Sequence, residues 1–135
     1  MWKAAEMNDS SVFWEDLMQD LEDPEFLRTY VLESIRIKSV DSIVNGLDDA
    51  RVKADLSKAA LARAISAEPA TIRRLLGAGT SNPTLGTVSE VAAALGYRLV
   101  LEPLSDELTS LTDALVTGHV DNPAEFRTAM TELAS

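Results

Sequence analysis

The sequence of 135 residues predicts an all-α fold. Apolar side chains recur at helical spacing through most of the chain, and capping residues and prolines mark where helices begin. Only residues 97–101 (YRLVL) show the weak alternation that is typical of a short strand. We therefore expect helices throughout the chain and one short strand.

The first part of the chain, residues 1–40, is predicted to be an acidic helical segment. Residues 9–19 form a possible amphipathic turn or two, with Phe13 and Trp14 on one side. Asp23 and Pro24 are typical of an N-cap followed by proline at the first helical position. This helix is expected to continue to about residue 38.

The middle of the chain, residues 41–103, is predicted to be a domain built around two short helices in residues 56–76. A helix over residues 41–53 precedes them. Ser57 suits the N-cap of the first short helix, and Pro69 suits the first turn of the second. Ile72, Leu75 and Leu76 give the second helix an apolar face. Such a pair packs at a steep angle and can place its second helix in the major groove of DNA.

The rest of the chain continues the helical pattern. A helix is expected to open at Asn82-Pro83 and to stop at Gly96, just before the candidate strand. Residues 104–135 are predicted to be a C-terminal helical extension of two helices. Ser105 is expected to cap the first of them, and Asn122 begins the second with a pattern similar to a capping box.

Composition limits the class of protein. Hydrophobic residues make up 46% and charged residues 25%, as is ordinary for a soluble globular chain, and the chain has no cysteine. Disulfides and thiolate chemistry are thereby excluded, and a reducing compartment is indicated. There is no apolar run of membrane-spanning length and no signal-peptide core near the start, so we expect a cytoplasmic protein without membrane contact.

Charge is unevenly distributed along the chain, which carries a formal net charge of −10. Residues 1–50 have a net charge of −8, residues 51–100 of +4, and residues 101–135 of −6. Exposed charges are screened beyond about 8 Å at physiological salt, so a basic region can bind a duplex even within an acidic chain. The acidic flanks are either a solvated surface or a surface that suits a basic protein partner.

Five segments of the sequence together carry a family resemblance. They are Asp23-Pro24-Glu25-Phe26 followed by Tyr30, residues 56–65 (LSKAALARAI), residues 70–76 (ATIRRLL), Asn82-Pro83-Thr84-Leu85, and residues 94–99 (ALGYRL). In this order they resemble the addiction-module antidote family, a HigA-like branch of the Cro/Xre repressor-type helix-turn-helix proteins. The resemblance covers roughly residues 20–102.

The resemblance implies a repressor-like five-helix helix-turn-helix domain, here with extra N- and C-terminal helices. It also implies an antitoxin of a type II toxin–antitoxin pair, which neutralises a small basic toxin and represses its own operon as a DNA-binding homodimer. The toxins of such pairs are often ribonucleases of the RelE-like fold. Three positions depart from the family pattern: Lys58 stands in place of glutamine, Ser66 in place of glycine and Glu68 in place of serine.

Eight residues are the candidates for DNA contact. Recognition helices read base edges mainly with residues near their N-terminus, here Ala70 and Thr71 followed by Arg73 and Arg74. We expect Arg73 to contact a base, since arginine can bind guanine bidentately, and Arg74 to reach a phosphate. The expected backbone contacts are those of Ser57, Lys58, Thr80 and Ser81.

Five residues of the N-terminal segment are the candidates for binding the protein partner. The acidic surface that sequesters a toxin is expected within Glu15–Glu33, which contains three of the five. Aromatic side chains are common binding hot spots, although Phe13 and Trp14 can equally pack against the core. The five candidates are Phe13, Trp14, Asp16, Glu22 and Tyr30.

Other functions are alternatives to this interpretation. One is a stand-alone transcriptional regulator without a toxin, and another is a protein-interaction adaptor that does not bind DNA. We do not expect an enzyme, a cofactor or a metal site, because no carboxylate pair stands with a nucleophile or base in a recognisable pattern. His119, the only histidine, has no companions at ligand spacing and is interpreted as a loop residue. The candidate strand at 97–101 is expected to pair across the two-fold axis of a homodimer.

Overall fold

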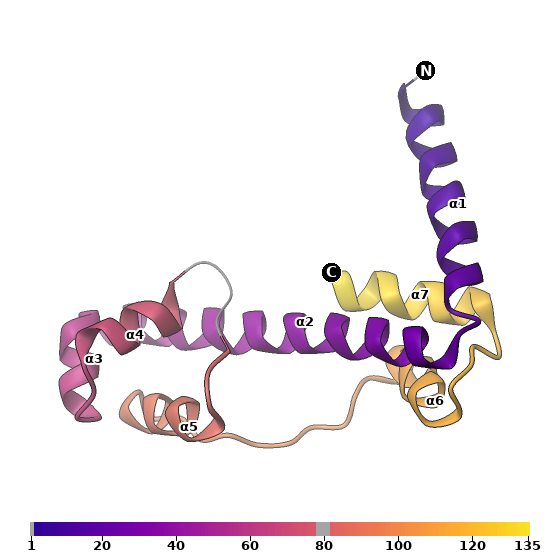
Figure 1. Cartoon of the computed structure of the whole chain (residues 1–135). Coiled ribbons are helices and arrows are strands. Elements are labelled where there is room, and N and C mark those ends of the chain that lie inside the picture. Colours follow the sequence, from indigo (N-terminus) through magenta and orange to yellow (C-terminus); the bar gives the residue numbers. More distant parts are fainter. Residues whose placement is uncertain (1, 78–81) are drawn as a thin grey trace. The chain divides into compact units, whose positions relative to one another are not determined.

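The computed structural model describes the backbone of residues 2–77 and 82–135, and the side chains of residues 11–77 and 82–135 (Figure 1). The regular secondary structure of the described residues is helical, with no strand, so the predicted all-α class is confirmed. The helices are α1 (Trp2–Asp20), α2 (Pro24–Lys53), α3 (Lys58–Ala64), α4 (Pro69–Leu76), α5 (Leu85–Ala94), the 3₁₀ helix η1 (Asp106–Leu108), α6 (Thr109–Thr117) and α7 (Pro123–Ala134).

The strand predicted at residues 97–101 is wrong. After α5 this segment is irregular, and the side chains of Val100 and Leu101 are exposed to solvent. A strand is stabilised by a neighbouring strand, and the described part of the chain offers none. The alternation in the sequence therefore reflects apolar residues on an irregular segment rather than a sheet.

The two helices expected over residues 24–38 and 41–53 are one continuous helix, α2. Ser39 and Asp41 are typical of a helix start, but in a helix interior such residues cost only fractions of a kcal/mol each. No proline lies in the interior of α2 to break its hydrogen-bond ladder. Val40, at the expected break, packs against buried side chains of unit 2, which favours continuation.

Several other helix starts also differ from the expectation. α1 begins at Trp2 rather than near residue 9, and α5 begins at Leu85, after an N-cap at Thr84 whose hydroxyl accepts a hydrogen bond from Thr87 N at 3.2 Å. Ser105 precedes η1 and makes no side-chain capping bond. The expected cap of the last helix is confirmed, because the Asn122 side chain accepts from Glu125 N at 3.2 Å.

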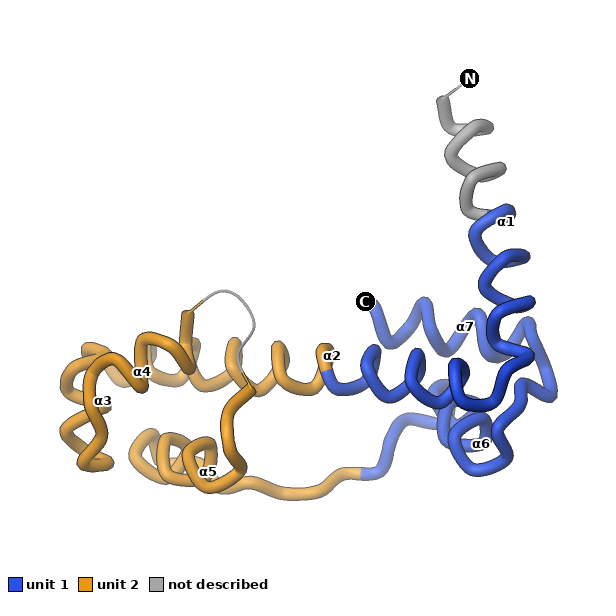
Figure 2. Tube along the Cα trace, viewed as in Figure 1, with its two compact units in different colours: residues 1–36, 103–135 blue, residues 37–102 orange. Residues whose placement is uncertain are grey.

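The chain divides into two compact units (Figure 2). Unit 1 consists of residues 1–36 and 103–135, and unit 2 of residues 37–102. The first and last of the three segments expected from the sequence thus belong to the same unit. None of the helices in the described part of the chain is both long enough and apolar enough to cross a membrane.

Unit 1 is held by an apolar core to which both ends of the chain contribute. Phe126 of α7 and Leu111 of α6 are fully buried, as are Leu27 and Val31 of α2. Leu17 and Leu21 belong to the same core. Burying such side chains stabilises a fold by about 1.5–3 kcal/mol each, so the two chain ends form one folded body.

Unit 2 has its own core. Leu61 and Ala62 of α3, Ile72 of α4 and Val91 of α5 are fully or almost fully buried in it. Val44 and Leu47 from the second half of α2 complete the cluster. α3 packs against both α4 and α5, so these three helices are fixed relative to one another.

Candidate functional site

The α3–α4 pair is defined by its caps and its turn. Ser57 is the N-cap of α3, and its side chain accepts a hydrogen bond from Ala60 N at 3.0 Å. In the turn, Ser66 has a φ of +54°, a left-handed conformation that glycine adopts without strain. Ala67 N then donates to Ala62 O at 2.9 Å, and α4 begins at Pro69. The sequence correctly predicts both helix starts.

The predicted buried face of α4 is confirmed. Ile72, Leu75 and Leu76 are buried against unit 2. The opposite face is therefore left for solvent or a ligand. It carries two guanidinium groups, and unit 2 as a whole holds eight basic and seven acidic side chains.

The predicted DNA-contacting residues that the structure describes lie along α3 and α4. Ala70, Arg73 and Arg74 are exposed, while Thr71 is half-buried. Ser57 is exposed at the N-terminus of α3 and Lys58, its first residue, is half-buried. Thr80 and Ser81 lie outside the described residues.

Glu68 occupies the N-cap position of α4 without acting as a cap. Its side chain makes no capping hydrogen bond, and the residue is exposed. It therefore places a carboxylate at the helix end that would approach phosphates. This is the one described feature of the α3–α4 surface that opposes binding of a polyanion.

The predicted partner-binding residues all lie in unit 1 but in different settings. Phe13 is 54% exposed and contacts the half-buried Trp14 edge-on, with ring centroids 5.7 Å apart. Trp14 packs against the core of unit 1. The guanidinium of Arg127 lies 5.2 Å from the centre of the Trp14 ring. Sequence reasoning did not single out Arg127, since the two residues are far apart in the chain.

The other three predicted partner residues do not gather around Trp14. Asp16 and Glu22 are exposed. Tyr30 is half-buried and stacks on Phe26 of α2, with ring centroids 6.3 Å apart. Phe26 itself is 41% exposed, so this aromatic pair borders solvent.

Electrostatics distinguishes unit 1 from unit 2. Unit 1 holds fifteen acidic and four basic side chains, a formal net charge of −11, against +1 for unit 2. On α2, Arg36 donates to Glu33 at 2.8 Å, and this hydrogen bond together with the charge attraction lowers the pKa of Glu33. All of the net negative charge of the chain is therefore carried by unit 1.

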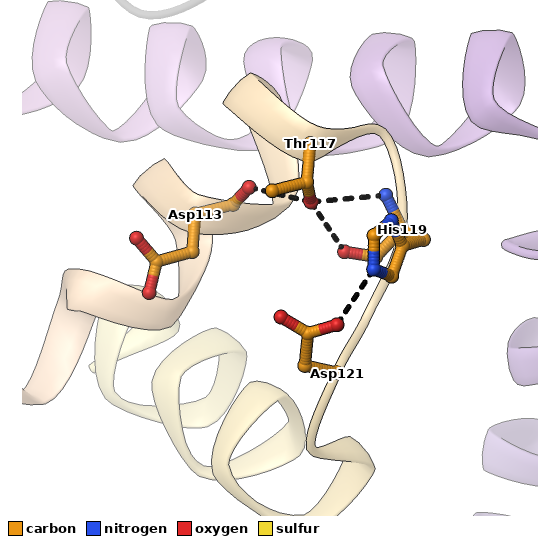
Figure 3. Close-up of polar contacts among 4 residues, drawn as sticks. All are labelled: Asp113, Thr117, His119 and Asp121. Carbon is orange, nitrogen blue, oxygen red and sulfur yellow. Dashed lines mark hydrogen bonds and ion pairs between the residues drawn. The ribbon is translucent and has the colours of Figure 1, made fainter.

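His119 lies in the loop after α6, where polar contacts order the chain (Figure 3). Its Nε2 is 2.6 Å from Asp121 Oδ1, and its backbone N–H donates to Thr117 Oγ1 at 3.3 Å. The Thr117 hydroxyl is 2.8 Å from the carbonyl oxygen of Asp113. Within residues that the structure describes, no group of three or more histidine, cysteine or acidic side chains is placed to hold a metal ion.

Comparisons with family models, with curated proteins and with solved structures found no match to this chain.

Proposed function

We propose that this chain is the antitoxin of a type II toxin–antitoxin pair. Unit 2 binds operator DNA through α3 and α4, and unit 1 neutralises a small basic toxin by direct binding. The observation that supports this division is the separation of charge, with −11 on unit 1 and +1 on unit 2. A basic partner and a polyanion are then attracted to different parts of the same molecule.

DNA binding in this proposal depends on the exposed face of α4. Arg73 and Arg74 project from the helix, and its other face is buried in the core. Arg73 reads a base edge and Arg74 holds a phosphate. The exposed N-terminus of α3 at Ser57 supplies free N–H groups for a second phosphate.

Repression in this proposal requires a homodimer, since a two-fold axis presents two α4 helices to half-sites about 34 Å apart. Val100 and Leu101 are large apolar side chains exposed on the segment that follows α5. Covering them in a dimer removes this apolar surface from water.

The DNA-binding part is tested by fluorescence anisotropy with a labelled duplex from the promoter of the chain's own gene. Replacing both Arg73 and Arg74 by alanine is expected to weaken binding at least tenfold. A matched control, Lys53→Ala with Arg98→Ala, removes two exposed positive charges from unit 2 outside α3 and α4. Equal losses in both double variants would mean that α4 is not the recognition helix. Absence of any binding at low salt would favour the alternative of a protein-interaction adaptor that does not bind DNA.

The neutralisation part is tested with the product of the adjacent reading frame. We expect a small basic protein that co-purifies with this chain with nanomolar affinity and whose growth inhibition is relieved by co-expression of this chain. If no neighbouring product binds while the promoter duplex does, the chain is a stand-alone regulator.

A further inference from the structure

Unit 1 carries a hollow between α1 and α7, which we call the apolar hollow. Its volume is about 810 Å³, and apolar atoms make up most of its exposed lining. α1 contributes Ser11, Trp14, Glu15, Met18 and Gln19, and α7 contributes Pro123, Ala124, Arg127 and Thr128. A hollow of this size accommodates several side chains of a partner.

A second hollow, of about 400 Å³, lies on unit 1 beside η1, α6 and α7, and we call it the acidic hollow. Four of its eight lining residues are carboxylates: Asp106, Glu107, Asp113 and Glu125. None of the eight is basic. The region therefore favours a cation strongly over an anion.

The two hollows adjoin on α7. Ala124 and Thr128 line both of them, so only one exposed alanine and one exposed threonine separate an apolar surface from a cluster of carboxylates. Both residues have small side chains. A single ligand can therefore occupy both.

Trp14 is held in place before any ligand binds. It packs against the core of unit 1, and the centre of its ring lies 5.2 Å from the Arg127 guanidinium carbon. A tryptophan that is already ordered loses little side-chain entropy on binding, which favours its use as an anchor. Phe13, in edge contact with Trp14 and 54% exposed, extends the apolar surface.

We infer that the two hollows together bind an amphipathic helical segment of a basic protein. Apolar side chains of that segment lie against Trp14 and Met18, and its lysines and arginines lie over the carboxylates of the acidic hollow. The choice of occupant follows from charge complementarity: an acidic or neutral segment gains nothing from the four carboxylates or from the −11 charge of unit 1. This inference rests on the proposed function, because it locates the surface that binds the toxin.

The binding test uses the full chain with Trp2→Phe, so that Trp14 is the only tryptophan. The probe is a synthetic peptide of about 18 leucines and lysines arranged so that the leucines share one helical face. The control peptide has the same composition in scrambled order. We expect the amphipathic peptide alone to change Trp14 emission. Equal changes with both peptides, or no change with either, would overturn the inference.

Variants locate the binding on the two hollows. Ala124→Phe fills the boundary between them at an exposed position and is expected to weaken peptide binding about tenfold. Thr29→Phe, the matched control on exposed α2 surface of unit 1, is expected to change it less than about twofold. Thr128→Phe is the second filling variant if Ala124→Phe does not fold. Unchanged binding in a folded filling variant contradicts the inference.

The acidic hollow is tested separately by replacing its four carboxylates with amides. The matched control replaces Asp20, Glu25, Glu33 and Glu132, four exposed carboxylates of unit 1 outside both hollows. Both quadruple variants have the same net charge, so a larger loss in the first measures local contact rather than long-range attraction. Equal losses would mean that the acidic hollow is not the binding surface.

The product of the adjacent reading frame distinguishes this inference from the proposed function. If it binds the unmodified chain and the Ala124→Phe variant equally, the assigned surface is wrong and the antitoxin proposal stands. If it fails to bind the unmodified chain while the amphipathic peptide binds, the antitoxin proposal fails and the surface stands.

Discussion

Arg28 of α2 donates a hydrogen bond from Nε to the carbonyl oxygen of Leu115 in α6, at 3.0 Å and across 87 positions of the sequence. Leu115 lies in the last turn of α6, where carbonyl groups lack helical partners and the helix dipole favours a cation. The contact therefore ties the two ends of the chain into unit 1.

Replacing Arg28 by alanine is expected to lower the free energy of unfolding of unit 1 by about 1 kcal/mol. The loss is that of the hydrogen bond from Arg28 Nε to the carbonyl oxygen of Leu115. Urea unfolding followed by circular dichroism measures it. Arg36→Ala, which removes only the exposed ion pair with Glu33, should leave the unfolding midpoint where it was.

Gly118 provides a second prediction for the same corner of unit 1. Its φ is +82°, and an added Cβ would lie 2.9 Å from Arg28 Nη2 and 3.3 Å from Pro24 Cβ. Gly118→Ala is expected to lower the free energy of unfolding by about 2–3 kcal/mol. This loss is the sum of the strain of a left-handed alanine and of the displacement of Arg28.

The matched control for Gly118 is Gly96→Ala. Gly96 has a similar φ of +86° but no atom within 4 Å of an added Cβ, so the expected cost is strain alone, about 1 kcal/mol. In an Arg28→Ala background the cost of Gly118→Ala should fall toward that of Gly96→Ala. If the two costs of Gly118→Ala, with and without Arg28, are equal, the two residues are not coupled.

Local patterns in the sequence predict the parts of the fold that depend on neighbouring residues. The buried face of α4, the Ser57 cap and the start of α4 at Pro69 all follow from spacing within a few residues. The continuity of α2 does not, because the packing of Val40 outweighs the local preference of Ser39 and Asp41 for a helix start.

The grouping of residues 1–36 with 103–135 could not be predicted either. The apolar faces of the terminal helices show that these helices are buried but not which helix covers them. For the same reason the sequence indicates Trp14 as a candidate anchor but not its contact with Arg127, nor the carboxylates of the acidic hollow. The acidic charge of residues 101–135 is the one signal that pointed toward that surface.

The two arginines of α4 should have separable effects on DNA binding if the proposed function is correct. Arg73→Ala is expected to weaken the free energy of binding to the promoter duplex by about 1–3 kcal/mol and to reduce the preference for this duplex over unrelated DNA. Arg74→Ala should weaken binding to both duplexes alike and reduce the slope of log K against log salt by about one unit. Anisotropy titrations from low to moderate salt measure both quantities. If Arg74→Ala reduces the preference for the promoter duplex and Arg73→Ala weakens binding to both duplexes alike, then Arg74 contacts the base and Arg73 the phosphate.

Glu68 gives the last prediction, since its side chain makes no capping hydrogen bond to α4 and its carboxylate would repel phosphates in the proposed DNA complex. Glu68→Ser supplies an N-cap hydroxyl and should raise the free energy of unfolding of unit 2 by about 0.5–1 kcal/mol.

Glu68→Gln removes only the charge and should strengthen binding to the promoter duplex about three- to tenfold at low salt. Glu90→Gln removes an equally exposed carboxylate from α5 and serves as the control. Because screening confines the effect to charges near the bound phosphates, the gain should be several times larger at position 68. Equal gains from both variants would show that net charge alone limits binding, and α4 would then not be the helix that approaches DNA.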